Sequence, residues 1–170
     1  GKVGNLVYPR GVNIIEKSDY PKIYDDIIYG LDFGFTNPTA LIKIGIINED
    51  TEKGIITKGY LEELIYESGL SLKVLIERMN ELGIAPGDTI YADCQDPAKI
   101  DALNSFQNQD GIYPFSVVPA DKDVKNGIDY TRSVERYSHA GNTHFNKEIT
   151  AYRWKLDARG NPVDGEPVKY

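Results

Sequence analysis

Two short apolar segments that each end in an aspartate constrain most strongly what this chain can fold into. Residues 27–35 read IIYGLDFGF, and residues 89–93 read TIYAD. Short apolar runs of this kind are typical of buried strands. A buried carboxylate is unfavourable unless it is paired, hydrogen-bonded or bound to a cation. Two strands that bring Asp32 and Asp93 to one edge of a sheet could therefore build a site for divalent metal ions.

The composition fits one globular domain with a core. The 170 residues are 41% hydrophobic and 26% charged, which is ordinary for a folded domain. The single cysteine, Cys94, excludes a disulfide within these residues and favours a reducing, intracellular setting. We expect no signal peptide and no membrane contact, because no apolar run approaches the roughly 20 residues of a membrane span. The net charge of −7 argues against tight, autonomous binding to nucleic acid, since phosphate contacts supply most of that affinity.

Hydrophobic periodicity predicts three strands followed by alternating helices and strands. Strands are expected within 27–35 and at 39–47, 55–66, 89–93 and 113–118. Helices are expected at 71–82, from Asp96-Pro97 to about Gln109, and from about Asp123 to Ser138. Residues 143–156 fit either a strand or a helix, and residues 157–167 are expected to be a loop. A meander followed by helical crossovers predicts an α/β fold with a mixed central sheet flanked by helices, which is the ribonuclease H-like order. In that fold, acids from the first and fourth strands meet.

Four segments together resemble the nuclease domain of tailed-bacteriophage terminase large subunits. Residues 29–40 (YGLDFGFTNPTA) are similar to the first nuclease motif of that family, and residues 92–97 (ADCQDP) to the second. Residues 122–129 (KDVKNGID) and 148–157 (EITAYRWKLD) resemble its basic and late segments. Each motif alone is weak, whereas their order and spacing over roughly residues 3–170 are specific.

The resemblance implies a metal-dependent endonuclease domain of a viral DNA-packaging motor, which cuts concatemeric double-stranded DNA in the host cytoplasm during phage assembly. Two Mg²⁺ or Mn²⁺ ions would support phosphodiester hydrolysis, with Asp32 and Asp93 as catalytic metal ligands. The implied partners are double-stranded DNA, the portal protein, the small terminase subunit and an upstream ATPase domain. Residues 1–26 are then expected to be a lead-in from that ATPase and residues 27–170 the nuclease domain. Its third acidic arm is expected beyond Tyr170.

Further candidate residues have two interpretations each. Asp96 precedes Pro97 and fits a helix cap better than a metal ligand, while Glu148 is either a late site acid or a helix acid. Four basic residues fall on one stripe of the helix expected at 123–138, namely Lys122, Lys125, Arg132 and Arg136. The stripe would be either a track for the DNA backbone or an ordinary solvated face.

Two other functions remain open from the sequence alone. The domain could mainly dock DNA or the portal ring, with little catalysis of its own. It could also be a resolvase or an integrase-like nuclease, which rests on analogy of fold alone. Metal-dependent cleavage separates the nuclease from the docking module.

Overall fold

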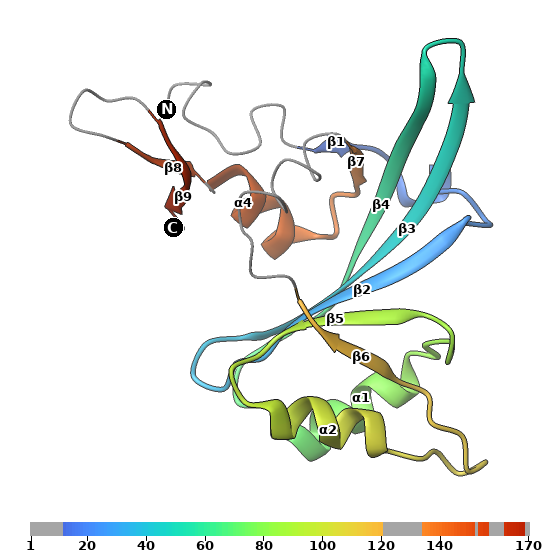
Figure 1. The fold of residues 1–170 in the computed structure, drawn as a ribbon, viewed down its shortest axis with the longest axis vertical. Helices are drawn as coiled ribbons and strands as arrows, with labels where there is room; N and C mark the ends of the chain where they lie inside the picture. The colour runs from blue at the N-terminus through green and yellow to red at the C-terminus, as the bar shows by residue number, and fades with distance from the viewer. Residues whose placement is uncertain (1–11, 121–133, 152, 157–161, 169–170) are drawn as a thin grey trace. The chain divides into compact units, whose positions relative to one another are not determined.

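The computed structural model describes residues 12–120, 134–151, 153–156 and 162–168. In chain order the elements are β1 (Asn13–Ile14), η2 (Lys17–Asp19), β2 (Asp26–Asp32), β3 (Thr39–Thr51), β4 (Gly54–Glu67), α1 (Leu72–Glu81), β5 (Thr89–Asp93), α2 (Pro97–Ser105), β6 (Ser116–Pro119), β7 (Glu135–Ser138), α4 (Thr143–Ala151), β8 (Arg153–Leu156) and β9 (Pro162–Val168). The strands form a seven-stranded mixed sheet in the order β1-β7-β4-β3-β2-β5-β6, and β8 pairs with β9 separately (Figure 1). The predicted mixed α/β sheet with helices is confirmed.

The chain divides into two compact units. The first, called the acid-bearing unit, comprises residues 24–46 and 62–120, and the second unit comprises residues 1–23, 47–61 and 121–170. β2, β5 and β6 lie within the acid-bearing unit together with α1 and α2. The hairpin of β3 and β4 contributes residues to both units.

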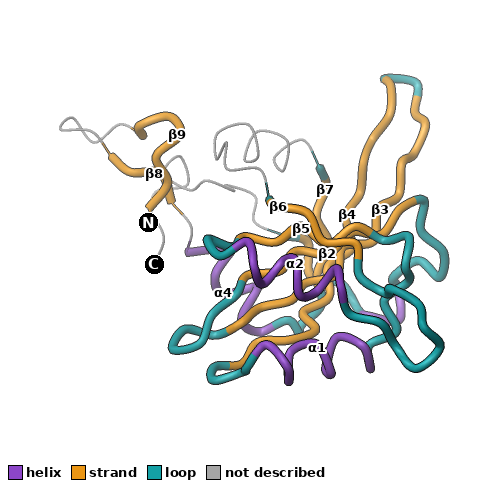
Figure 2. Tube along the Cα trace, turned by 60° about the horizontal axis from the view of Figure 1, so that its bottom comes forward, coloured by secondary structure: helices purple, strands orange, loops and turns teal. Residues whose placement is uncertain are grey.

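The acid-bearing unit holds the main hydrophobic core. β2 runs antiparallel to β3 and parallel to β5, and β5 runs parallel to β6. Figure 2 shows α1 and α2 on the same face of β2, β5 and β6. The core between helices and strands contains Tyr29, Leu31, Leu41, Leu75, Met79, Ile90, Ala92, Ile100, Leu103 and Val117. Because side chains alternate along a strand, burial of Tyr29 and Leu31 sends Asp32 to the opposite face of the sheet.

The two helices of this unit begin at the residues that the sequence predicts. The Ser71 hydroxyl accepts a hydrogen bond from the Val74 N–H and caps α1, and Gly83 follows that helix at a φ of 70°. The Asp96 carboxylate accepts from the Ala98 N–H and caps α2, with Pro97 in the first turn. α2 ends at Ser105, a few residues earlier than expected.

Within the second unit, a strand replaces the end of an expected helix. Residues 135–138 form β7, so the prediction of a helix reaching Ser138 is wrong there, and residues 123–133 lie outside the described residues. β7 runs parallel to β4, where residues 58–60 pair with residues 135–137, and parallel to β1 on its other side. These inter-strand hydrogen bonds occupy the backbone groups that a helix would use. β1 lies within the expected lead-in.

The C-terminal segment also differs from its prediction. The ambiguous residues 143–156 contain both α4 and β8, so both interpretations apply to successive parts. The loop expected at 157–167 is wrong for residues 162–167, because these belong to β9. β9 pairs antiparallel with β8. Pairing between segments is not visible in local composition, which is rich in glycine and proline here.

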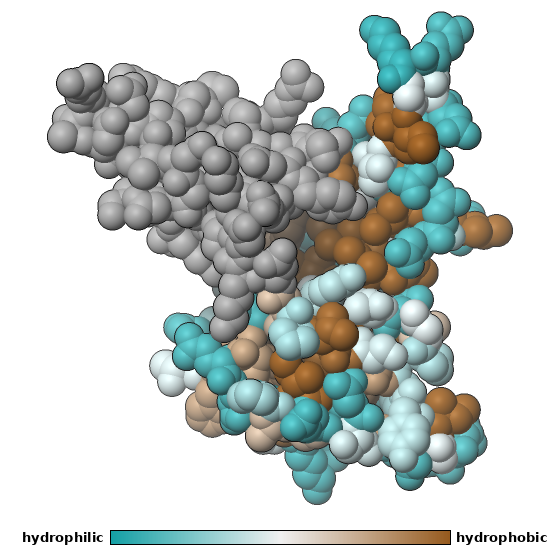
Figure 3. Space-filling view, in the orientation of Figure 1, coloured by the Kyte–Doolittle hydropathy of each residue, from teal (hydrophilic) through white to brown (hydrophobic). Residues whose placement is uncertain are grey.

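The hairpin of β3 and β4 continues past the end of its pairing with β2. The pairing of β2 with β3 begins at Asp26 opposite Ile46, whereas β3 runs on to Thr51. The Lys58 amine and the Glu49 carboxylate form an ion pair at 2.8 Å between the two strands of the hairpin. Figure 3 shows hydrophilic residues over the tip of the hairpin. Among the described helices, none is both long and apolar enough to cross a membrane.

Candidate active site

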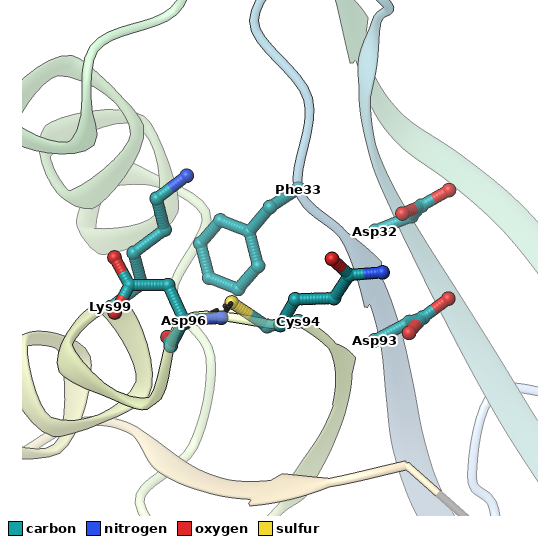
Figure 4. Close-up of a pocket in the computed structure, with 7 residues that line it drawn as sticks. Asp32, Phe33, Asp93, Cys94, Asp96 and Lys99 are labelled. Atoms are coloured by element: carbon teal, nitrogen blue, oxygen red, sulfur yellow. Dashed lines mark hydrogen bonds between the residues drawn. The ribbon is translucent and has the colours of Figure 1, made fainter. Parts of the chain in front are cut away.

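A pair of aspartates ends two neighbouring strands. Asp32 is the last residue of β2 and Asp93 the last of β5, and the parallel register places them directly opposite each other. Paired residues on adjacent strands point to the same face, and neighbouring strands lie about 4.8 Å apart. Figure 4 shows the two carboxylates side by side and pointing in the same direction. Both residues are exposed. The acids predicted at the ends of the first and fourth core strands, which are β2 and β5 in the structure, therefore lie next to each other as expected.

A tight turn fixes the position of Asp32. The Gly34 N–H donates to the Thr39 hydroxyl at 3.1 Å, and that hydroxyl donates back to the Gly34 carbonyl at 2.8 Å. Thr39 is only 1% exposed, so water does not compete for these bonds. A Cβ atom at Gly34 would collide with the backbone carbonyl of Asn37. The turn therefore requires glycine, and it returns the chain into β3, where Ala40 pairs with Asp32.

The loop after Asp93 is held by local hydrogen bonds of its own. The Cys94 thiol donates to the Asp96 carbonyl at 3.1 Å and accepts from the Asp96 N–H at 3.4 Å. The Asp96 carboxylate accepts from the Ala98 N–H at 3.0 Å. The interpretation of Asp96 as a helix cap is confirmed by this contact, which occupies one of its carboxylate oxygens.

An open pocket of about 300 Å³ surrounds the aspartates. It is lined by Asp32, Phe33, Asp93, Cys94, Gln95, Asp96 and Lys99 (Figure 4). The Lys99 amine lies 5.5 Å from the centre of the Phe33 ring. The site residues predicted from the sequence did not include Phe33, Gln95 or Lys99. The available signal for Lys99 was its position three residues after the cap Asp96, in the first turn of α2.

Of the remaining predicted site residues, the two that the structure describes do not line this pocket. Arg136 belongs to β7 and Glu148 is exposed on α4, both in the second unit. Because Arg136 lies in a strand, the helical spacing that grouped it with the other basic residues does not apply to it. Lys122, Lys125 and Arg132 lie outside the described residues.

The chemistry of the donors suits a hard divalent cation. Carboxylate oxygens are preferred ligands of Mg²⁺ and Mn²⁺, and Mg²⁺ is commonly bound by one or two carboxylates while it keeps several waters. Asp32 and Asp93 provide such a pair on an accessible face. In the described part of the chain, no group of three or more His, Cys, Asp or Glu residues could hold a metal ion. The described residues therefore fit one hydrated ion and do not by themselves provide a closed metal cage.

Solved structures with the same fold were found, whereas no protein-family model and no curated protein matches the sequence. The nuclease domain of the large terminase (g2p) of bacteriophage SPP1, with bound Mn, is 22% identical with a TM-score of 0.66, over 93% of this chain and 87% of that chain. The large terminase of a thermophilic bacteriophage is 18% identical with a TM-score of 0.65, over 98% of this chain and 41% of that chain. The nuclease domain of the P22 large terminase is 14% identical with a TM-score of 0.53, over 95% of this chain and 86% of that chain. The chain has the fold of these phage terminase nuclease domains, which is ribonuclease H-like, as the sequence predicts.

Proposed function

We propose that this chain is the nuclease domain of a phage DNA-packaging terminase and that it hydrolyses double-stranded DNA with the help of Mg²⁺ or Mn²⁺. The observation that carries the proposal is the direct pairing of Asp32 and Asp93 in an open pocket at the ends of β2 and β5. The likeness in fold to terminase nuclease domains supports it, and the Mn in the SPP1 structure supports a divalent cation.

In this mechanism Asp32 and Asp93 would hold the cation. Bound divalent ions would stabilise the negative charge that develops on the phosphate and lower the pKa of a bound water, and two ions are expected in the complete site. The two carboxylates also control access of DNA. A carboxylate about 4 Å from a phosphate is repelled by roughly 1 kcal/mol even in water. The DNA backbone therefore approaches this pair favourably only when the negative charge is neutralised.

The acidic composition of the chain fits a domain that receives DNA from partners. With a net charge of −7, the chain lacks the positive excess that strong, autonomous DNA binding needs. We propose that an upstream ATPase domain, the small terminase subunit and the portal protein deliver the DNA, in the host cytoplasm during phage assembly. The chain matches 41% of the longer large terminase from the thermophilic bacteriophage, whose structure is also known in complex with ADP, and this supports the place of this chain beside an ATPase domain. The boundary between residues 1–26 and 27–170 remains a prediction, as does the contact of Lys122, Lys125, Arg132 and Arg136 with DNA.

Cleavage of supercoiled plasmid tests the proposal. We expect cleavage with Mg²⁺ or Mn²⁺ and none in EDTA, and we expect Asp32→Asn to lower the rate by more than about a hundredfold, because it weakens binding of the catalytic ion. Asp101→Asn is the matched control, since Asp101 is an exposed aspartate of α2 outside the pocket. It should cleave like the parent chain.

Three results would redirect the proposal. Cleavage that is unchanged by Asp32→Asn would place the chemistry elsewhere. An intact plasmid, also with a version of the protein extended beyond Tyr170, would favour the docking module. Strong preference for branched over linear duplex would favour a resolvase.

A further inference from the structure

One positively charged side chain, that of Lys99, lines the same pocket as the acidic side chains. Lys99 lies in the first turn of α2, and the pocket around it contains the carboxylates of Asp32, Asp93 and Asp96. Lysine amines close to carboxylates ordinarily form ion pairs with them. The placement of the Lys99 amine is therefore informative.

The Lys99 amine is placed against an aromatic ring instead of a carboxylate. It lies 5.5 Å from the centre of the Phe33 ring, and Figure 4 shows the side chain extended beside that ring. Ion pairs of the described residues include Lys58 with Glu49 and Arg78 with Glu67. Among the described residues, no carboxylate forms an ion pair with the Lys99 amine. An ammonium group on the face of an aromatic ring is attracted by the ring without losing its hydrogen-bond donors. The ring thus restrains the amine and leaves its three donors available to an anion.

The backbone of Phe33 connects this arrangement to the acid pair. Phe33 follows Asp32 directly in the chain, and its side chain packs against the hydrophobic core of the acid-bearing unit. Lys99 is fixed from the other side by α2, whose cap Asp96 lies in the loop that follows Asp93. The amine is therefore positioned by the same two strand ends that carry the aspartates.

We propose that Lys99 binds a backbone phosphate of the DNA strand that lies at the acid pair, and that the Phe33 ring positions its amine for this contact. The inference rests on the proposed nuclease function for its choice of anion. A strand held at Asp32 and Asp93 presents further phosphates along its backbone, and a positively charged group in the pocket offsets their repulsion by the carboxylates. Lys99 is thus a DNA-positioning residue that the sequence motifs did not identify.

Equilibrium binding of a short fluorescein-labelled DNA duplex tests the contact apart from cleavage. Binding is measured by fluorescence anisotropy in a fixed concentration of Ca²⁺, a hard cation that takes carboxylate ligands and neutralises the acid pair without supporting the Mg²⁺- or Mn²⁺-dependent cleavage, at several salt concentrations between about 50 and 200 mM. Loss of one phosphate contact lowers the slope of log K against log salt by about 0.9 and weakens binding by about eightfold near 0.1 M salt. We expect these changes for Lys99→Ala and a smaller loss of affinity for Phe33→Leu, which removes the ring but keeps an apolar side chain. Lys99→Arg should retain the slope.

Lys73→Ala is the matched control, because it removes the same charge from an exposed position of α1 outside the pocket. It should leave the slope of the parent chain unchanged. The inference is overturned if Lys99→Ala binds with the slope of the parent chain, if Lys73→Ala has an equal effect, or if the parent chain shows no duplex binding even at the lowest salt.

Cleavage kinetics separate failure of this inference from failure of the proposed function. In the nuclease assay, Lys99→Ala should raise KM for the duplex more than it lowers kcat, because the contact forms when DNA binds. A normal KM would contradict the contact while leaving the nuclease intact. Conversely, unchanged cleavage by Asp32→Asn together with a reduced salt slope for Lys99→Ala would reject the nuclease site and retain the phosphate contact.

Discussion

At the scale of single residues, Asp88 carries a charge that the fold disfavours. It lies just before β5, and burial raises the pKa of its carboxyl group above the ordinary value. The charge of Asp26 raises that pKa further, whereas Lys43 lowers it. The folded state thus holds this proton more tightly than the unfolded state does. Ionised Asp88 therefore lowers stability above its raised pKa, and this cost disappears below the ordinary pKa of an aspartate.

Replacement of Asp88 by asparagine should consequently stabilise the protein near neutral pH. The gain is expected to be a few tenths of a kcal/mol, because the group is only partly buried and its interactions are screened by solvent. Urea denaturation at pH 7 and again near pH 4 measures it, and the difference between Asp88→Asn and the parent chain should shrink at the lower pH. Asp101→Asn provides the exposed control. Destabilisation by Asp88→Asn at neutral pH, or a gain that grows on acidification, would contradict the argument.

At the scale of elements, a buried asparagine joins α4 to the sheet of the second unit. Asn142 immediately precedes α4 and is 1% exposed. Its side-chain amide donates to the Leu61 carbonyl of β4 and to the Ser138 hydroxyl of β7, both at 2.8 Å. The main-chain carbonyl of Asn142 accepts the first hydrogen bond of α4, from the Asn146 N–H. One side chain therefore satisfies buried polar groups on two strands at the point where the helix begins.

Replacement of Asn142 by alanine should lower the free energy of unfolding by about 2–4 kcal/mol. The substitution removes the hydrogen bonds to the Leu61 carbonyl and to the Ser138 hydroxyl and creates a small void, while the Leu61 carbonyl keeps its hydrogen bond from the Tyr20 hydroxyl. Asn80→Ala, at an exposed position of α1, is the control and should be neutral or slightly stabilising, because alanine favours helix. The measurement is urea denaturation followed by circular dichroism. A loss below about 1 kcal/mol for Asn142→Ala would show that water replaces these contacts.

The elements differ in how well the sequence predicted them, for a physical reason. The capping residues Ser71 and Asp96 indicate where α1 and α2 begin, because capping is a local interaction between residues two or three apart. The turn at Gly34 and the two strand-end aspartates are likewise visible locally, which is why the acid pair was predicted. The predictions for β7 and β9 were wrong, because these strands are specified by pairing with other segments of the chain.

The same distinction applies to the candidate site. Asp32 and Asp93 follow from the order of strands, since parallel neighbours bring their ends to one edge. Phe33 directly follows β2, whereas Lys99 lies in α2, and no spacing pattern in the sequence predicts the contact between them. Contacts of this kind depend on how a helix packs onto the sheet, which no local pattern of residues specifies.

At the scale of the whole molecule, both aspartates belong to the acid-bearing unit, as do all residues that line their pocket. A cation held by Asp32 and Asp93 would connect the ends of β2 and β5 and would bind the folded state in preference to the unfolded chain. Added Mn²⁺ should therefore raise the thermal midpoint. At about ten times the dissociation constant the gain is about 1.4 kcal/mol, which corresponds to roughly 3–5 °C for a chain of this size.

Calorimetry with and without Mn²⁺ tests this expectation, with Asp93→Asn as the decisive variant. In EDTA the variant should be at least as stable as the parent chain, because it relieves repulsion between two directly paired carboxylates. In Mn²⁺ the variant should be less stable than the parent chain, because it no longer binds the cation. Asp101→Asn should show the same rise in thermal midpoint with Mn²⁺ as the parent chain. Hydrogen exchange should then slow at the ends of β2 and β5. An equal shift in Asp93→Asn, or protection confined to the second unit, would place the metal away from the acid pair and remove the main support for the proposed nuclease.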